Sequence, residues 1–373
     1  MKILIVLDTP YAFKSGIWFH RNHLPSIGLK NRGHAIKFLA LGGTISDKLL
    51  DWPDTVIFGR TYHPEMKPLE ALGQYKARGK RVLYDIDDDF WAVNPDNPSV
   101  LVSNAYKDQY EDFIRQADAV ITPSRVLAKK VRKLCRKKDV FICPNMTTDN
   151  YYKMRPKEHE ELIIGYAGAA SHWKDLQIVV DPLLELKKDY DFRFVMLGVA
   201  GGPLEGEMYT YDQILKRGLQ PEKEEYYKEA LRLYGRAKAL DIVHIPFYPP
   251  ELYPHVLSRA DFDIGLCPLD DNEFNKGKSC IKFYEYASVG TAVLASDILP
   301  YKDEVNYRAK NNFKDWYKKL KKLITDKEFR EGLAEKQFKW VKENRDIDKV
   351  AVDWELACQK KGGLKVLNQT KGL

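Results

Sequence analysis

Short apolar runs alternate with longer amphipathic stretches through the first 146 residues. Apolar runs that are separated by segments long enough for a helix are typical of a parallel sheet wrapped by helices. We predict strands at 3–8, 35–41, 55–60, 81–87, 119–124 and 140–146.

A second alternating series follows a break in the pattern. Residues 147–161 are polar, contain proline and show no clear period, so we predict a linker there. Beyond it we predict strands at 162–168, 192–198, 241–247, 262–269 and 291–297. The pattern therefore predicts an α/β fold of two doubly wound parallel-sheet domains, 1–150 and 160–344, that face each other across a cleft at the carboxyl ends of their strands.

The tail is expected to be helical from about residue 311 onward. Five large side chains recur there at helical spacing and should face the core, namely Phe313, Trp316, Tyr317, Leu320 and Leu323. A last helix, over about 345–373, is expected to pack back on the first domain.

Composition narrows the class of protein. With 44% hydrophobic and 12% aromatic residues in 373, the chain does not resemble a disordered protein. Its five cysteines lack the CxxC spacing of a zinc ribbon and the context of a disulfide framework. No stretch approaches the roughly 18 apolar residues of a membrane span, and the apolar run before Asp8 is too short for a signal peptide. We therefore expect a cytoplasmic protein.

The formal charge of +7 is partly concentrated in one segment. Residues 125–138 hold eight basic residues and no acid, and apolar residues recur among them at helical spacing. This predicts a basic amphipathic helix. Three interpretations stay open: a solvated face, peripheral contact with an anionic membrane, and contact with nucleic acid.

The segment 274–297 carries the most informative chemistry. It predicts a helix that begins near Ser279 and ends at Gly290, where a glycine suits a left-handed C-cap.

Three charged residues in this segment, Lys278, Lys282 and Glu285, are spaced i, i+4, i+7. If the helix extends back to Lys278, they share one face. Two lysines near a helix N-terminus suit a diphosphate, and Glu285 is then free to accept hydrogen bonds from ribose hydroxyls. The alternative is a surface ion pair between Lys282 and Glu285.

The stretch KFYEYASVGTAVLASD (282–297), together with the two-domain pattern, resembles the nucleotide-sugar glycosyltransferases of the two-Rossmann-domain (GT-B) type, most closely the retaining family 4. That family carries two glutamates separated by seven residues, and the second binds the donor ribose. Glu285 matches the second position. The first position falls on Gly277, where this sequence departs from the pattern, and Lys278 and Ser279 follow instead.

The resemblance implies a glycosyltransferase that moves a sugar from a nucleoside diphosphate sugar to a hydroxyl, with retention and with neither a metal ion nor another cofactor. The second domain would hold the donor, with Glu285 on the ribose, Lys278 and Ser279 near the diphosphate, and Lys282 in support. The first domain would hold the acceptor, which is a glycan, a lipid-linked glycan or a nucleic acid.

The loop GYAGAASHWKDL (165–176) follows the first strand of the second domain. Small residues such as Gly168 let a backbone approach a phosphate, and Ser171 is expected to be an N-cap, followed by His172 and Lys174. In the family this loop faces the donor diphosphate. The alternative is a turn that merely closes a strand onto a helix.

Two further segments belong to the first domain. The resemblance places the loop that contains Ser15 and Gly16 near the donor phosphates and the acceptor, and the nearby histidines are expected to pack on the helix. In the run DIDDDFW (85–91), Asp87 and Asp88 are predicted to bind or deprotonate an acceptor hydroxyl. Alternatives are a divalent metal site, or helix capping and ion pairs with the basic residues at 78–81.

The leading hypothesis is therefore a glycosyltransferase in which Asp87, Asp88, Lys278 and Glu285 take part in catalysis. A second hypothesis keeps the fold but makes a nucleic-acid base the acceptor. A third, motivated by Gly277, is a sugar-nucleotide-binding relative without transferase activity.

Overall fold

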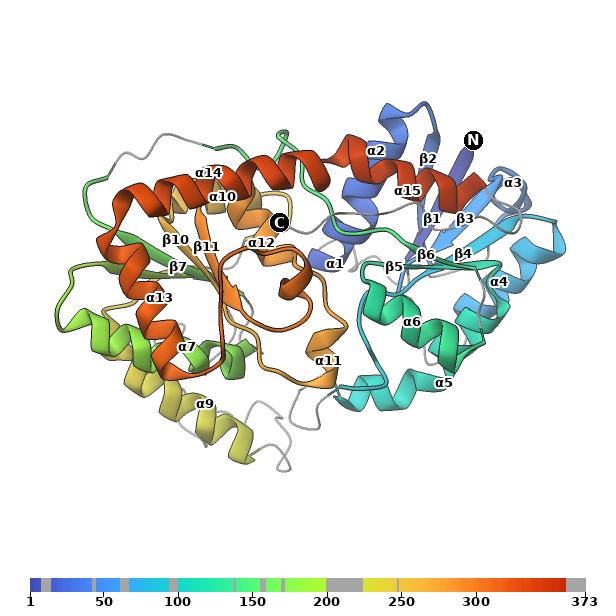
Figure 1. Cartoon of the computed structure of the whole chain (residues 1–373). Coiled ribbons are helices and arrows are strands. Elements are labelled where there is room, and N and C mark those ends of the chain that lie inside the picture. The colour runs from blue at the N-terminus through green and yellow to red at the C-terminus, as the bar shows by residue number, and fades with distance from the viewer. Residues whose placement is uncertain are drawn as a thin grey trace.

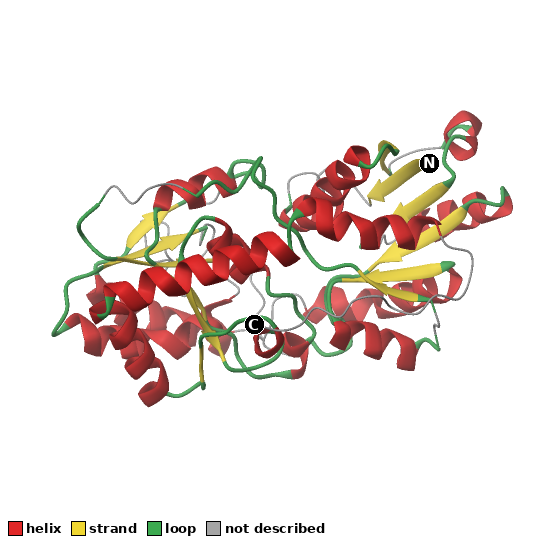
Figure 2. Cartoon of the chain, turned by 45° about the horizontal axis from the view of Figure 1, so that its top comes forward, coloured by secondary structure: helices red, strands yellow, loops and turns green. Residues whose placement is uncertain are grey.

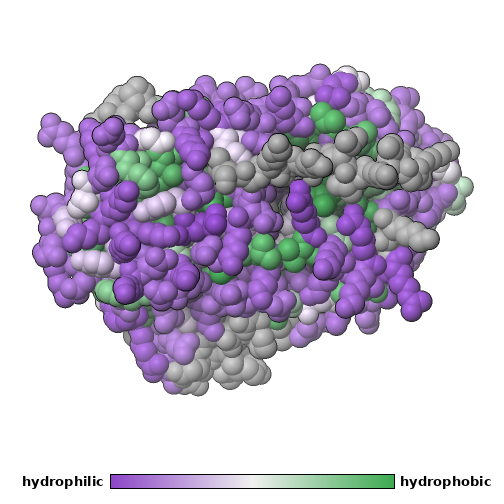
Figure 3. Space-filling view, in the orientation of Figure 1, coloured by the Kyte–Doolittle hydropathy of each residue, from purple (hydrophilic) through white to green (hydrophobic). Residues whose placement is uncertain are grey.

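The fold is that of a computed structural model, which describes residues 1–7, 15–41, 45–60, 67–93, 100–136, 139–154, 159–168, 172–198, 224–246 and 248–359. Figure 1 shows two lobes side by side, one built from the amino-terminal strands and the other from the strands that follow. Most of the face drawn in Figure 3 is hydrophilic, with small apolar patches.

The first lobe is built on a six-stranded parallel sheet in the order β2-β1-β3-β4-β5-β6. Helices cover both faces of this sheet (Figure 2), and its central strands are accordingly buried along their length. Its strands are β1 (Lys2–Leu7), β2 (Ala35–Ala40), β3 (Thr55–Phe58), β4 (Arg81–Asp85), β5 (Ala119–Thr122) and β6 (Val140–Ile142). Its helices are α1 (Gly16–Trp18), η2 (Phe19–His23), α2 (Leu24–Asn31), α3 (Asp47–Asp51), α4 (Lys67–Ala77), α5 (Val100–Gln116) and α6 (Arg125–Leu134), joined by α15 (Ile347–Gln359).

The second lobe holds another six-stranded parallel sheet, in the order β12-β11-β10-β7-β8-β9. The chain builds outward from β7 to β9 and then returns to the other side of β7, so the loops after β7 and β10 diverge at the point where such sheets bind ligands. Its strands are β7 (Ile163–Ala167), β8 (Arg193–Leu197), β9 (Val243–Ile245), β10 (Ile264–Cys267), β11 (Ala292–Ser296) and β12 (Arg308–Ala309). Its helices are α7 (Trp173–Lys187), α9 (Glu224–Ala237), η5 (Lys238–Leu240), α10 (Tyr253–Ala260), α11 (Glu273–Lys276), α12 (Ile281–Ser288), η6 (Tyr301–Asp303), α13 (Phe313–Thr325) and α14 (Lys327–Asn344).

The chain passes between the lobes twice, and the two crossings lie together. The backbone N–H of Thr147 donates to the carbonyl of Arg345 at 2.8 Å, and the Thr147 hydroxyl accepts from Ser288 at 3.0 Å. After the second crossing, α15 packs against α2 (Figure 1). Gly28 permits this approach, because a Cβ there would lie 2.6 Å from the Cβ of Ala351.

The predicted fold class is confirmed: two doubly wound parallel sheets carry helices on their faces. Every predicted strand matches an observed one, and β12 was missed because two residues are too few to show a period. The prediction that Phe313 faces the core is wrong, since it is 49% exposed and stacks on Tyr317. Within the described residues, no helix is long and apolar enough to cross a bilayer.

Candidate functional site

Polar side chains gather where β7 and β10 end. His172 directly precedes α7, and its Nδ1 lies 2.7 Å from Oδ2 of Asp175. The other carboxylate oxygen of Asp175 accepts from the backbone N–H of Asp270, which follows β10, at 2.8 Å. Asp175 therefore orients the His172 ring and ties together the two loops that diverge at the centre of the sheet.

Two lysines approach this junction from the start of α12. Lys282 lies in the first turn, with Nζ 5.3 Å from the ring centroid of Tyr166 in β7. Because α12 begins at Ile281, Lys278 precedes the helix, and the condition for it to share a helical face with Lys282 and Glu285 is not met. Burial lowers the pKa of Lys282, and the charge of Lys278 adds to this effect.

Neither lysine has a carboxylate within ion-pair distance in the described part of the chain. Asp175 and Glu285 attract Lys282 from beyond ion-pair distance, but the two neighbouring lysines still repel each other, and an anion that binds between them removes this repulsion. Lys278 and Lys282 are thus suited to bind a phosphate group.

His172 responds to the same charges. The positive charge of Lys282 lowers the pKa of His172 to about 4, with burial and Lys278 acting in the same direction and Asp175 against them. At neutral pH the ring is therefore uncharged. Because Asp175 accepts a hydrogen bond, Nδ1 carries the proton and Nε2 carries a lone pair.

Glu285 is buried at the junction of the two lobes, with 5% of its surface exposed. Its Oε1 lies 3.1 Å from the Tyr152 hydroxyl and 3.2 Å from Nε2 of His20, and its Oε2 lies 3.2 Å from the Tyr253 hydroxyl. Burial raises the pKa of both tyrosines and the Glu285 charge adds to this, so their hydroxyls stay protonated and donate. The alternative of a surface ion pair with Lys282 is wrong.

This arrangement changes the expected role of Glu285. The sequence predicts a carboxylate free for ribose hydroxyls, whereas the structure engages both oxygens with protein donors. An ionised carboxylate accepts about four hydrogen bonds, so capacity for about one more remains. Glu285 therefore also holds the linker and the first lobe in place.

A chain of polar groups joins Ser279 to the first lobe. The Ser279 hydroxyl accepts from Nδ2 of Asn145 at 2.8 Å, and Oδ1 of Asn145 accepts from Nη1 of Arg21 at 3.0 Å. Arg21 also donates to both oxygens of Asp85, at 3.0 and 2.5 Å, and both side chains of this ion pair are 2% exposed. The position of Ser279 thus depends on a buried ion pair in the first lobe.

Asp87 and Asp88 share one cation. Nη1 of Arg60 lies 3.5 Å from each carboxylate, so the alternative of ion pairs with the basic residues at 78–81 is wrong. Burial raises the pKa of Asp87 to about 6, with Asp88 adding to the rise and Arg60 opposing it. A carboxyl group with a pKa near neutral exchanges a proton readily with a hydroxyl.

The carboxylates of the acidic run are divided among separate cations. Asp85 pairs with Arg21, Asp89 pairs with Lys130 at 2.5 Å, and the two between them face Arg60. Among the described residues, no group of three or more His, Cys, Asp or Glu side chains is arranged to hold a metal ion.

Gly277, where the sequence departs from the family pattern, lies at the interface of the lobes. Its carbonyl accepts from the hydroxyl of Ser124, the N-cap of α6, at 2.7 Å. A Cβ at this position would lie 3.1 Å from the Cβ of Asp89. A side chain at this position would therefore require Asp89 to shift by a few tenths of an ångström.

The remaining predicted residues are dispersed. Ser15 caps α1 by accepting from the backbone N–H of Trp18 at 3.1 Å, and Gly16 has open space where a Cβ would point. A Cβ on Gly168 would lie 3.0 Å from the Tyr166 hydroxyl oxygen.

Lys174 lies in the first turn of α7. It lines an open pocket of about 1060 Å³ between α7 and α9, and its Nζ lies 5.5 Å from the ring centroid of Trp173. Ser171, the predicted N-cap, lies outside the described residues, and His172 stands at the N-cap position without a side-chain capping bond.

The basic helix is confirmed as α6, but part of its charge serves the fold. Lys130 pairs with Asp89, and Nη2 of Arg132 donates to the carbonyl of Val140 at 2.6 Å. Lys129, Lys133 and Arg136 are exposed, so an anionic surface can reach them.

Several site residues escaped sequence reasoning, namely His20, Arg21, Asn145, Tyr152 and Tyr253. Their partners lie far along the chain: Tyr152 and Glu285, for example, are 133 residues apart. Local spacing carries no signal for such contacts.

No family model matches the chain, and no curated protein matches it in sequence. Solved structures match over nearly the whole chain. A glycosyltransferase from Rickettsia africae ESF-5 is 13% identical, with a TM-score of 0.62 over 95% of this chain and 97% of that one. Anabaena Alr3699/HepE, in complex with UDP and glucose, is 12% identical, with a TM-score of 0.61 over 94% and 98%. An α-glucosyltransferase in complex with UDP and a 13-mer DNA containing an HMU base is 14% identical, with a TM-score of 0.62 over 96% and 100%. At these identities the likeness shows a shared fold, the two-domain GT-B arrangement.

Proposed function

We propose that this chain is a glycosyltransferase that moves a sugar from a UDP-sugar to a hydroxyl acceptor. The observation that carries the proposal is the pair Lys278 and Lys282, which makes no ion pair among the described residues and lies near the ends of β7 and β10. A nucleoside diphosphate supplies the missing negative charge. Uridine is favoured because two of the solved proteins compared above hold UDP on the same fold.

The proposed reaction proceeds with retention and without a metal ion. When the bond between the sugar and the diphosphate breaks, negative charge accumulates on the leaving group, and fixed cations stabilise it. Lys278 and Lys282 serve this purpose in the second lobe. Asp87, in the first lobe, has a carboxyl group suited to receive the proton of the acceptor hydroxyl.

A thermal-shift panel of UDP, GDP, ADP, TDP and CMP tests the donor class. A nucleotide at about 100 times its Kd stabilises a protein by roughly 2.7 kcal/mol. We expect a shift with UDP and little with the others. A rise in melting temperature with another nucleotide would indicate a donor with that base. No rise with any nucleotide would contradict the proposal.

Glu285→Gln provides a sharper test than truncation. Glutamine keeps the shape and most hydrogen bonds, so we expect UDP affinity to fall about tenfold, or about 1.4 kcal/mol, with little change in thermal stability. Glu285→Ala should also lose about 1–3 kcal/mol of stability, because buried donors from Tyr152, Tyr253 and His20 lose their acceptor. Glu328→Gln removes an exposed carboxylate on α14 and is the control. Equal UDP affinity in Glu285→Gln and the wild type would refute a role in donor binding.

Activity separates this proposal from a non-catalytic relative. Release of UDP from a UDP-sugar, slowed in Glu285→Gln, identifies a transferase. Binding of UDP-sugars without any turnover across acceptors would favour the binding protein.

The second candidate acceptor is nucleic acid, favoured by the exposed cations on α6 and directly after it. A protein of the same fold was solved with DNA, and Ser124 at the start of α6 contacts the second lobe through Gly277. A polymer held on α6 would therefore lie close to the interface of the lobes.

Neutralising Lys129, Lys133 and Arg136 together should weaken binding to DNA and flatten its dependence on salt. If all three contact phosphates, the slope of log K against log salt should fall by about 2.7. The control replaces Lys314, Lys318 and Lys336, which are exposed on α13 and α14 and carry the same total charge. Unchanged DNA binding in the α6 variant would remove this candidate, whereas loss of sedimentation with anionic vesicles would point to a lipid-linked acceptor. Lys130 and Arg132 stay intact in this test because they serve the fold.

A further inference from the structure

His172 lies between one fixed carboxylate and two cations. Asp175 holds Nδ1 at 2.7 Å and is itself fixed by the backbone N–H of Asp270. Among the described residues, Nε2 has no hydrogen-bond partner. Lys282 lies against Tyr166 near the end of β7, a few residues before His172, and the charges of both Lys282 and Lys278 act on the His172 ring.

We propose that His172 takes up one proton from solvent when the nucleoside diphosphate group binds, donates a hydrogen bond from Nε2 to that group, and releases the proton when the nucleoside diphosphate leaves. The inference rests on the proposed function, because it requires a diphosphate beside Lys278 and Lys282. No covalent bond to His172 forms, and the proton taken from solvent returns to solvent.

The charges that face His172 account for this behaviour. Lys282 from α12 and Lys278 before it oppose a positive ring, and Asp175 from α7 favours one. Asp270 presents its backbone to Asp175, and its own carboxylate accepts from Nδ2 of Asn272 at 2.9 Å. An uncharged His172 therefore avoids placing a third positive charge beside Lys278 and Lys282.

A bound diphosphate reverses the balance. Its negative charges cancel the effect of Lys282, which is the main cause of the lowered pKa of His172. Asp175 still favours the charged ring, and the diphosphate now does so as well, so we expect the pKa to return to about 6.5 or above. Protonated His172 then supplies a third positive charge beside the diphosphate, which stabilises the negative charge that develops on the leaving group.

Calorimetry with UDP-glucose measures the proton directly. UDP-glucose is the probe because its diphosphate is esterified at both ends and does not titrate near neutral pH, unlike that of UDP. Titrations at pH 6 in two buffers of different ionisation enthalpy give the number of protons bound. A pKa that rises from about 4 to about 6.5 predicts uptake of about 0.75 proton at pH 6 and almost none at pH 8. The same shift makes binding about fourfold tighter at pH 6 than at pH 8.

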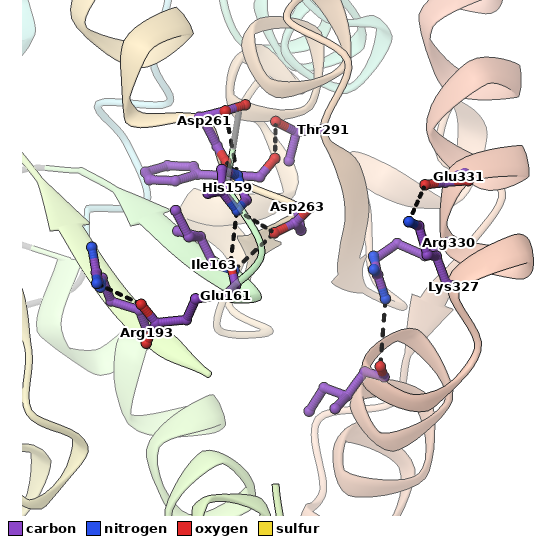
Figure 4. A network of polar contacts seen from close by, with 12 residues as sticks. His159, Glu161, Ile163, Arg193, Asp261, Asp263, Thr291, Lys327, Arg330 and Glu331 are labelled. Carbon is purple, nitrogen blue, oxygen red and sulfur yellow. Dashed lines mark hydrogen bonds and ion pairs between the residues drawn. The ribbon is translucent and has the colours of Figure 1, made fainter. Parts of the chain in front are cut away.

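The variants assign the proton to a residue. The glutamine in His172→Gln cannot be protonated, so we expect the uptake of about 0.75 proton and the pH dependence to vanish and the affinity at pH 6 to fall about fourfold. His159→Gln is the matched control, since Figure 4 shows His159 at the opposite end of β7, where its Nε2 lies 3.0 Å from the Asp261 carbonyl. That variant should keep the uptake.

Two outcomes overturn the inference while leaving the proposed function intact. One is binding of UDP-glucose to the wild type at pH 6 without proton uptake. The other is the same uptake in His172→Gln, which would assign the proton to another group, such as His20 beside Glu285. If UDP-glucose does not bind the wild type at all, the proposed function fails for this donor and the inference falls with it.

Discussion

Replacing Lys282 by methionine should lower the affinity for UDP about 100-fold and leave the fold intact. The loss corresponds to about 2.7 kcal/mol, in the range expected when a charged donor to a phosphate is removed from a partly buried site. Methionine keeps an unbranched apolar stem against Tyr166, where Nζ now lies 5.3 Å from the ring centroid.

The thermal stability of Lys282→Met should equal or exceed that of the wild type. Burial lowers the pKa of Lys282, which means that folding disfavours its charged form at neutral pH. Removing the charge relieves that cost, and no ion pair within the described residues is lost. If Lys282→Met is at least as stable as the wild type but binds UDP much more weakly, Lys282 serves ligand binding and not stability.

Lys302→Met is the control, because Lys302 is exposed on η6 and should change neither property. Isothermal titration with UDP and thermal denaturation supply the two measurements. If Lys282→Met binds UDP as the wild type does, the diphosphate does not lie at the start of α12 and the proposed donor site is wrong.

The sequence allowed these lysines to be found because their signal is local. Lys278 and Lys282 stand in a short segment that ends at Gly290, whose φ of +81° confirms the predicted left-handed C-cap. The parallel strands were equally predictable, since strands buried on both faces appear as apolar runs. Neither inference needs information from elsewhere in the chain.

The partners of Glu285 could not be predicted in this way. Tyr152 lies in a stretch that shows no period and was predicted as a linker, and His20 was expected only to pack on its helix. Both reach Glu285 through the tertiary fold, which brings the first lobe, the linker and α12 to one point. The local sequence around a polar residue in an irregular segment does not indicate a partner 133 residues away.

The acidic run shows the same limit. From the sequence, its carboxylates form one group aimed at the cleft. In the fold, Asp85 and Asp89 are buried in separate ion pairs, because the cations that neutralise them lie on η2 and α6. Only Asp87 and Asp88 share a partner, Arg60. The division leaves Asp87, with its raised pKa, as the carboxyl group of this run best suited to exchange a proton.

We expect Arg21→Met to destabilise the protein by about 3–5 kcal/mol, the cost of leaving one member of a buried ion pair without its partner. Arg21 and Asp85 are each 2% exposed, and Arg21 also donates to the Cys143 carbonyl at 2.8 Å and to Asn145. Loss of Arg21 therefore also weakens the support of Ser279.

The destabilisation should depend on pH in a defined direction. Burial raises the pKa of Asp85 and Arg21 opposes this rise, so without Arg21 the pKa rises further. Between the unfolded value of 3.8 and the raised folded value, the native variant binds a proton that the unfolded chain does not. Its stability therefore falls as pH rises through that range, and the deficit should be smaller at pH 5 than at pH 7.5.

Urea unfolding followed by tryptophan fluorescence measures the effect, since the Arg21 guanidinium lies 4.8 Å from the Trp354 ring centroid. Arg78→Met is the matched control: its ion pairs with Asp47 and Asp51 are largely exposed and should together contribute no more than about 1 kcal/mol. Adding Asp85→Asn to Arg21→Met should recover part of the loss, because the double variant buries no unpaired charge. If Arg21→Met costs no more than Arg78→Met, the buried pair does not support the interface, and the position of Ser279 must depend on other contacts.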